Sequence, residues 1–240
     1  MTTSPLADAN FDRLRRNPYP GRGLVIGRSP AGDLWLILYW IMGRSANSRN
    51  RRFAAEGGTL RTEPVDFKLV TDPSLIIYEA MLERPGLFVV SNGDQTRTVF
   101  EALQSGGSFD GALSTREREP DAPNFTPRIT GLLDLREGGG AVTLSLLKAD
   151  PLDPRLTGRT TIRPAVPAPG FGFGLTTYSG DGNPLPSFSG DPLLLPIPAG
   201  AEAVLEAYWD ALNAENRISL AVKTVPSGGG ASRILVRNRF

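Results

Sequence analysis

The segment from residue 44 to residue 52 holds the densest group of side chains that could bind an anion. Two serines and two asparagines lie among its arginines, which are Arg44, Arg49, Arg51 and Arg52. Guanidinium groups bind carboxylate and phosphate oxygens through paired hydrogen bonds. The residues alone leave two interpretations open, a solvated basic loop and a phosphate site.

The elements before this segment place it at the end of a buried strand. Residues 34–42 are almost wholly apolar, which predicts a strand that is covered on both faces. A shorter apolar strand at 24–26 precedes it, and turn-forming residues at 29–33 join the two. A central hairpin therefore delivers the arginines to one edge of the fold.

The composition excludes several kinds of chemistry. The chain has 240 residues, no cysteine, no histidine and a net charge of +1. A thiol nucleophile is excluded, and the commonest general base and metal ligand is missing. The small net charge argues against general nucleic-acid binding. Any catalysis must use tyrosine, lysine, arginine, carboxylate, hydroxyl or amide groups.

The N-terminal part of the sequence gives no targeting signal. Residues 1–17 are polar and lack the apolar centre of a signal peptide. The longest apolar run, 34–42, is too short to span a bilayer. We expect a cytoplasmic protein without a membrane partner. Residues 1–21 are expected to be irregular, and we divide the chain into an N-terminal arm, 1–18, and a single domain, 19–240.

The other predicted elements are mostly hairpins, with three helices. Strands are predicted at 53–70 (one or two), 75–78, 87–90, 128–135, 141–147, 160–162, 172–178, 218–225 and 233–236. Helices are predicted from Asp94, as N-cap, to about 106, at 108–117 and at 201–214. Many antiparallel hairpins with few crossover helices favour an α+β protein with two stacked, mainly antiparallel sheets.

Four stretches in this order and spacing resemble the archaeal-type IMP cyclohydrolase family. They are 19–23 together with Arg44, Ser45 and Arg49; the strand at Tyr78; 89–94; and 119–129. The resemblance covers residues 19–130 and continues weakly to Tyr178. It implies a four-layer αββα sandwich of the Ntn-hydrolase-like class, without the N-terminal nucleophile of that class.

The resemblance also implies an activity. The family closes formyl-AICAR (5-formamidoimidazole-4-carboxamide ribonucleotide) to IMP with loss of water, the last step of de novo purine biosynthesis. Such a reaction needs positioning and proton transfer, so we expect no metal and no cofactor. The expected partner is this small nucleotide, and the oligomeric state, including a homo-oligomer, is left open. A non-catalytic purine-nucleotide-binding protein on the same scaffold is the alternative, and an amidohydrolase is a third.

The resemblance assigns site residues by position. Tyr78, Glu119 and Arg49 are the expected catalytic residues, Arg49 also as a phosphate ligand. The expected substrate-binding residues are Arg22, Arg44, Asn47, Arg51, Ser91, Asn92, Gly93, Asn124, Thr126, Arg128 and Tyr178.

Other interpretations of these residues stay open. Tyr78 could be a core tyrosine, and 91–93 a plain turn. The acidic loop could be solvated, and Asp121 is the other candidate base within it.

Overall fold

The apolar run predicted as a two-sided strand forms β2 (Leu34–Met42), near the centre of a six-stranded sheet. Its odd-numbered side chains, such as Tyr39, face the second sheet, and its even-numbered ones, such as Trp40, face a helical layer. Both side chains are fully buried. The strand therefore joins two apolar layers, as its lack of polar residues predicts. The computed structural model describes residues 3–70, 73, 76–136 and 138–240.

The first sheet has six antiparallel strands in the order β11-β10-β1-β2-β12-β13. The hairpin of β1 and β2 lies in its middle, with Leu24 opposite Tyr39. The other strands extend the sheet on both sides. Besides β2, the strands are β1 (Gly23–Arg28), β10 (Phe171–Thr176), β11 (Leu193–Pro196), β12 (Arg217–Pro226) and β13 (Arg233–Asn238).

The second sheet has seven antiparallel strands that follow one another in chain order, from β3 to β9. Each strand pairs with the next through a hairpin or a longer excursion. The strands are β3 (Arg52–Glu56), β4 (Thr59–Glu63), β5 (Glu79–Arg84), β6 (Leu87–Ser91), β7 (Arg128–Asp134), β8 (Ala141–Ala149) and β9 (Thr157–Ile162).

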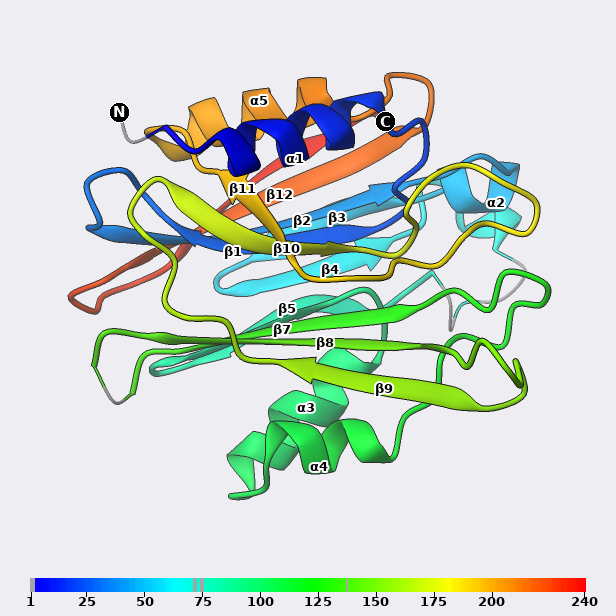
Figure 1. Ribbon diagram of the computed structural model, residues 1–240, viewed down its shortest axis with the longest axis horizontal. Helices are drawn as coiled ribbons and strands as arrows, with labels where there is room; N and C mark the ends of the chain where they lie inside the picture. Colours follow the sequence, from blue (N-terminus) through cyan, green and yellow to red (C-terminus); the bar gives the residue numbers. More distant parts are fainter. Residues whose placement is uncertain (1–2, 71–72, 74–75, 137) are drawn as a thin grey trace.

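Helices cover the outer face of each sheet, which gives four layers in the order αββα (Figure 1). Helices α1 (Pro5–Arg16) and α5 (Ala201–Ala211) lie over the first sheet, and α3 (Gln95–Gln104) and α4 (Phe109–Ser114) over the second. Separate apolar clusters fill the three spaces between the layers. The predicted α+β sandwich of two antiparallel sheets is confirmed, and its Ntn-hydrolase-like label stays a prediction.

The N-terminal segment differs from the irregular arm that we expected. Residues 5–16 form helix α1, which begins after the N-cap Ser4, with a proline in its first turn. Phe11 and Leu14 are buried against the first sheet and α5, and the Phe11 ring lies 5.2 Å from that of Tyr208. The cap, the proline and the apolar pair at i and i+3 are ordinary helix signals. The polar composition of the segment hides these signals, because the helix buries only one narrow face.

Several other boundaries also differ. The strand predicted at 75–78 is wrong for residues 76–78, because β5 begins at Glu79; Leu75 lies outside the described residues. The arginine-rich segment contains a short helix, α2 (Ala46–Arg49), and a 3-10 helix, η1 (Phe67–Leu69), follows β4. Helices α4 and α5 end earlier than predicted, and strand β11 was not predicted at all.

Candidate functional site

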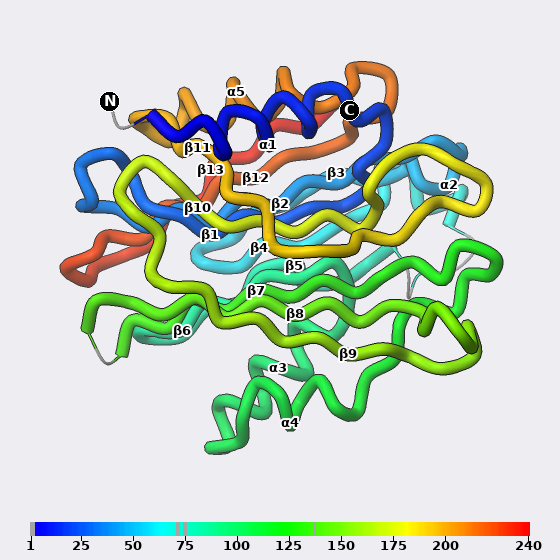
Figure 2. Tube along the Cα trace, in the orientation of Figure 1, coloured from blue at the N-terminus to red at the C-terminus, as the bar shows by residue number. Residues whose placement is uncertain are grey.

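A cleft of about 380 Å³ opens at the edge of the sheets where α2 lies. Five segments line it: the turn before β1, the end of β2 with α2, Ile76 ahead of β5, the loop before β7, and the chain after β10. Figure 2 shows that these segments meet at one end of the molecule, although they are far apart in sequence. The predicted site residues that line the cleft are Arg22, Arg44, Asn47, Arg51, Glu119, Asn124, Thr126 and Tyr178.

A buried ion pair joins the turn before β1 to the loop before β7. Arg22 Nη2 donates a 2.8 Å hydrogen bond to Glu119 Oε2, and Arg22 Nη1 donates to the Asn92 carbonyl at 3.1 Å. Only 8% of Arg22 and 5% of Glu119 is exposed. Burial alone would lower the pKa of Arg22, but the Glu119 carboxylate, with the nearby Tyr78 and Tyr39, raises that pKa well above its usual value. Arg22 therefore keeps its charge inside the protein, beside the Glu119 carboxylate.

Gly21 is needed because the next layer of the site lies directly against it. Its φ of +71° is in the left-handed region. A Cβ atom there would lie 2.2 Å from the Thr177 hydroxyl and 2.6 Å from the Tyr178 ring. Only glycine combines this backbone conformation with so close an approach.

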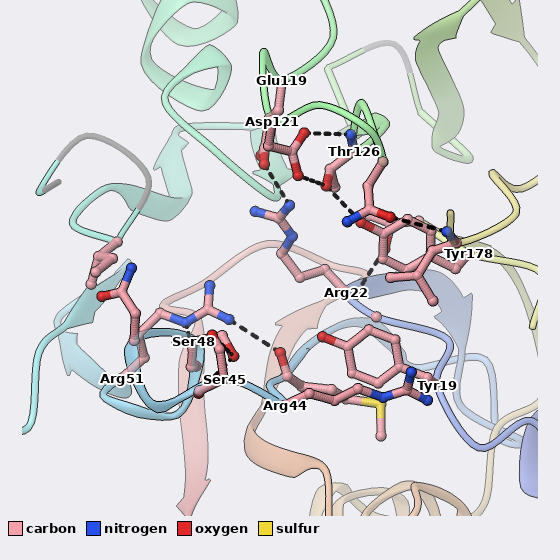
Figure 3. A pocket seen from close by; sticks show the side chains of 17 residues that line it. Tyr19, Arg22, Arg44, Ser45, Ser48, Arg51, Glu119, Asp121, Thr126 and Tyr178 are labelled. Carbon is pink, nitrogen blue, oxygen red and sulfur yellow. Dashed lines mark hydrogen bonds and ion pairs between the residues drawn. The ribbon is translucent and has the colours of Figure 1, made fainter. Parts of the chain in front are cut away.

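Three side chains form a hydrogen-bonded chain at one wall of the cleft (Figure 3). The Thr126 backbone N–H donates to Asp121 Oδ1 at 2.6 Å, and the Thr126 hydroxyl donates to Asp121 Oδ2. The Thr126 and Tyr178 hydroxyl oxygens are 2.6 Å apart. Burial raises the pKa of Tyr178 to about 12, so its phenol stays protonated at neutral pH.

The loop from 119 to 126 is closed on itself, which fixes these groups. The Glu119 backbone N–H donates to the Thr126 carbonyl at 3.0 Å, and the Asn124 backbone N–H donates to the Asp121 carbonyl at 3.1 Å. The amide oxygen of Asn124 accepts from the Leu185 backbone N–H at 3.0 Å. Because this oxygen is engaged, the amide N–H₂ is the part of Asn124 that remains for a ligand.

Arg51 supplies the most isolated positive charge of the cleft. Its Nε donates to the Ser48 carbonyl at 2.9 Å and its Nη2 to the Met42 carbonyl at 3.1 Å, and only 6% of the residue is exposed. Among the residues that the structure describes, no carboxylate pairs with Arg51. A buried cation without a counter-charge is costly, so this position favours a bound anion.

Arg44 lies at the more exposed rim of the same cleft. Its guanidinium covers the Tyr19 ring at 4.1 Å and pairs with Asp181 at 2.6 Å. Hydrogen bonding to Asp181 raises the pKa of Arg44, and the same contact lowers the pKa of Asp181. Exposed ion pairs contribute little net stability, so Arg44 can exchange Asp181 for a ligand anion.

Neutral polar groups lie beside these two arginines. Asn47, Ser45 and Ser48 line the same part of the cleft. The Asn47 amide oxygen is buried and has no hydrogen-bond partner among the described residues. It is therefore a free acceptor beside two cations.

Two of the three predicted catalytic residues do not line the cleft. Arg49 is half-buried on α2, and its Nε donates to the Gly43 carbonyl at 3.2 Å. Tyr78 is buried between the sheets, with its hydroxyl 2.7 Å from that of Tyr39. Burial raises the pKa of Tyr39 well above its usual value, and Tyr78 raises it further. The tyrosine pair influences Arg22 electrostatically, and neither tyrosine lines the cleft.

The predicted residues at 91–93 and Arg128 also lie outside the cleft lining, and their contacts hold the loop before β7. The Asn92 side chain donates to the Pro127 carbonyl at 2.8 Å and accepts from the Ile129 backbone N–H at 2.9 Å. The Ser91 hydroxyl bonds the Gly93 carbonyl within the same turn. Their contacts are those of a supporting turn, the structural alternative that the sequence left open.

Arg128 is held by the start of α3. It donates to Asp94 at 2.8 Å and to Gln95 at 2.7 Å, and a Cβ on Gly93 would meet the Arg128 guanidinium at 2.5 Å. Asp94 is the N-cap residue of α3, as predicted, but its side chain makes no capping hydrogen bond, because its carboxylate pairs with Arg128 and Arg116.

Several residues of the cleft were not predicted as site residues. The Tyr19 ring stacks on the Tyr178 ring, with centroids 5.9 Å apart and planes at 19°. Thr177 accepts from the Arg22 backbone N–H at 3.1 Å. Tyr19 lies within a stretch that carried the family resemblance and Thr177 within its weaker continuation, so their neighbourhood was a usable signal. Ile76 and Leu185, by contrast, reach the cleft through irregular loops, which no sequence pattern marks.

The part of the chain that the structure describes holds neither a metal-binding cluster nor a membrane-spanning helix. No group of three or more aspartates and glutamates there is arranged to hold a metal ion. No described helix is long and apolar enough to cross a membrane.

The fold and the cleft together define an α+β sandwich protein with an arginine-rich cleft at one edge of its two sheets. The sequence model of the IMP cyclohydrolase-like protein family matches residues 19–229. The IMP cyclohydrolase of the archaeon Methanothrix thermoacetophila is 34% identical over 121 residues, which is 49% of this chain. The aligned part is 59% of the length of that relative. The chain belongs to the IMP cyclohydrolase-like family, which confirms the predicted resemblance.

Proposed function

We propose that this protein closes formyl-AICAR to IMP, the last step of de novo purine biosynthesis. The carboxamide nitrogen of the substrate attacks the formyl carbon on the same imidazole ring and forms a C–N bond. The carboxamide nitrogen and the formamido nitrogen each give up one proton, and the formyl oxygen leaves with these two protons as water. Family membership and the name of the archaeal relative support this activity.

The single observation that carries the proposal is the division of the cleft into two chemically different ends. Arg51 and Arg44, with the free amide oxygen of Asn47 nearby, suit the phosphate and ribose of a nucleotide. The Arg22–Glu119 pair and the Asp121–Thr126–Tyr178 chain suit the end where protons move. A nucleotide bound across both ends would be held for an intramolecular attack, and such positioning can contribute about 7–11 kcal/mol.

Glu119 is our proposed general base. It is the carboxylate of the cleft that carries a fixed cationic partner, and Arg22 positions it by a hydrogen bond. Arg22 also offers positive charge to the oxygen anion that develops on the formyl group. Tyr78 stays a predicted proton carrier. Because its hydroxyl contacts Tyr39 and its nearest effect on the cleft is on the pKa of Arg22, we propose that Tyr78 acts through Arg22.

The test is conversion of formyl-AICAR by the purified protein, followed as the appearance of IMP. We expect turnover without added metal and in the presence of EDTA. A rate equal to the buffer blank would refute the proposal. Tight binding of the nucleotide without turnover would instead favour the non-catalytic nucleotide-binding alternative.

A further inference from the structure

The hydrogen-bonded chain at the cleft wall has only one consistent direction. A backbone N–H can only donate, so the Thr126 N–H fixes Asp121 Oδ1 as an acceptor. The Thr126 hydroxyl donates its single proton to Asp121 Oδ2, the other oxygen of the same carboxylate. The Thr126 oxygen, 2.6 Å from the Tyr178 oxygen, can then only accept from Tyr178. The Tyr178 proton therefore points at Thr126, in the wall of the cleft, and not into the open space where a ligand would lie.

We propose that Tyr178 presents only hydrogen-bond acceptor sites to the cleft, and that Asp121, acting through Thr126, is the positioning residue that sets this polarity. The site then selects a ligand that places an N–H or O–H donor against Tyr178. This inference rests on the proposed function for the identity of the ligand. In the proposed substrate, the donor is either the carboxamide nitrogen or a ribose hydroxyl.

The packing around Tyr178 keeps its hydroxyl in this position. Its ring stacks on Tyr19 and lies against Gly21, and only 5% of the residue is exposed. Thr126 is buried at 3% exposure. With both hydroxyl groups held in place, the direction of the chain is decided by protons and not by side-chain movement.

A single substitution should reverse the chain. In Asp121→Asn the Thr126 N–H still requires an oxygen opposite it, which turns the amide N–H₂ toward the Thr126 hydroxyl. The Thr126 hydroxyl oxygen then accepts a hydrogen bond from the new amide. The Thr126 hydroxyl donates its own proton to Tyr178. The Tyr178 proton turns into the cleft, and the site becomes selective for an acceptor.

The binding test compares two ligands of the same shape, 5-aminoimidazole-4-carboxamide ribonucleotide and its 4-carboxylate counterpart, by calorimetry. We expect the wild-type protein to prefer the carboxamide by at least about tenfold, and Tyr178→Phe to lose most of that preference. Asp121→Asn should invert it. Thr126→Ser should behave as wild type, because serine keeps the hydroxyl.

A double variant separates polarity from charge. Removing the Asp121 charge alone would also favour a carboxylate ligand. Asp121→Asn combined with Thr126→Val removes the charge but interrupts the chain, so the preference should not invert. If the double variant inverts the ligand preference as fully as Asp121→Asn does, the proposal is overturned.

The 2′-deoxyribose form of the carboxamide ligand tests the other donor, the ribose hydroxyl. If this ligand binds the wild type more weakly than the ribose form does, and the difference vanishes in Tyr178→Phe, the contact belongs to the ribose. If Tyr178→Phe changes neither comparison, the acceptor role is refuted.

A second measurement needs no ligand. Ionisation of Tyr178 in the free protein can be followed by NMR with ring-labelled tyrosine and assigned with Tyr178→Phe. Asp121→Asn should lower the pKa of Tyr178, because Thr126 then donates to the phenolate. Adding Thr126→Val should raise that pKa again, and no difference between these two variants would contradict the reversal. This result stands or falls independently of IMP formation, so failure of the proposed function and failure of this inference are distinguishable.

Discussion

Arg22 Nη2 and Glu119 Oε2 lie 2.8 Å apart in the buried part of the cleft, although the two residues are 97 positions apart in the chain. The contact ties the turn before β1 to the loop before β7. Because Arg22 also holds the Asn92 carbonyl, it links the first strand of one sheet to two segments next to the other sheet. The side chain of the proposed base is thus positioned by a contact between segments far apart in sequence.

Glu119→Gln tests that base. Glutamine keeps the shape and an acceptor for Arg22 but cannot take a proton, so kcat should fall roughly 10²–10⁴-fold with little change in KM. Steady-state kinetics of IMP formation measures this, and thermal unfolding should show a lower Tm, because Arg22 loses its buried counter-charge. Near-full kcat would move the base elsewhere, and Asp121 would be the next position to test.

Arg51→Ala tests the phosphate end. The proposed contact is remote from the reacting atoms, so KM should rise while kcat changes much less, at a cost of about 1.5–3 kcal/mol in kcat/KM. Arg52→Ala is the matched control, since Arg52 is exposed, pairs with Glu63 and does not line the cleft. Arg49→Ala should have a smaller effect than Arg51→Ala. If KM rises only in Arg49→Ala, Arg49 is the phosphate ligand, as the family resemblance implies.

Tyr78→Phe tests the remaining predicted catalytic residue. If Tyr78 carries a proton, the variant should lose roughly 10²–10⁴-fold in kcat. Tyr39→Phe removes only the hydrogen-bond partner of Tyr78 and should cost less. The two variants are compared by kcat and by the pH dependence of kcat. Equal, small losses in both would show that the buried pair is structural.

The stability of the protein should depend on pH through Tyr178. Burial raises the folded-state pKa to about 12, above the usual tyrosine value of about 10. A raised pKa means that the stabilisation is complete below pH 10 and is lost as the pH rises toward 12. The loss is about 2–3 kcal/mol. Urea unfolding of wild type and Tyr178→Phe across this range measures it: the wild type should lose more stability than the variant, and parallel curves would contradict the assignment.

Leu14→Ala tests whether the N-terminal helix is part of the folded core. Leu14 is 2% exposed and packs in the layer between the first sheet and α5. Truncating a buried leucine costs about 2–5 kcal/mol, whereas Leu6→Ala on the same helix, at 60% exposure, should change stability by less than about 0.5 kcal/mol. Chemical denaturation gives both values. Equal effects would mean that the helix is dispensable.

Local patterns were sufficient for most of the strands and helices. The apolar run of β2, with no polar residue to place in water, required cover on both faces, and hairpin turns between β-rich runs predicted antiparallel sheets. The order and spacing of four short stretches predicted the family, and the match of the family sequence model confirms it. These features depend on neighbours in sequence, where periodicity and turn chemistry act directly.

Only the tertiary structure decided which candidates share a cleft. Arg49 and Arg51 look alike in sequence, yet Arg51 lines the cleft while Arg49 does not. Asn92 and Arg128 have the side chains of ligand-binding residues, but these side chains form hydrogen bonds to neighbouring segments of the protein. The direction of the Asp121–Thr126–Tyr178 chain likewise depends on contacts between segments 52 positions apart. Sequence supplies the donors and acceptors, and the packing of distant segments determines which of them remain free for a ligand.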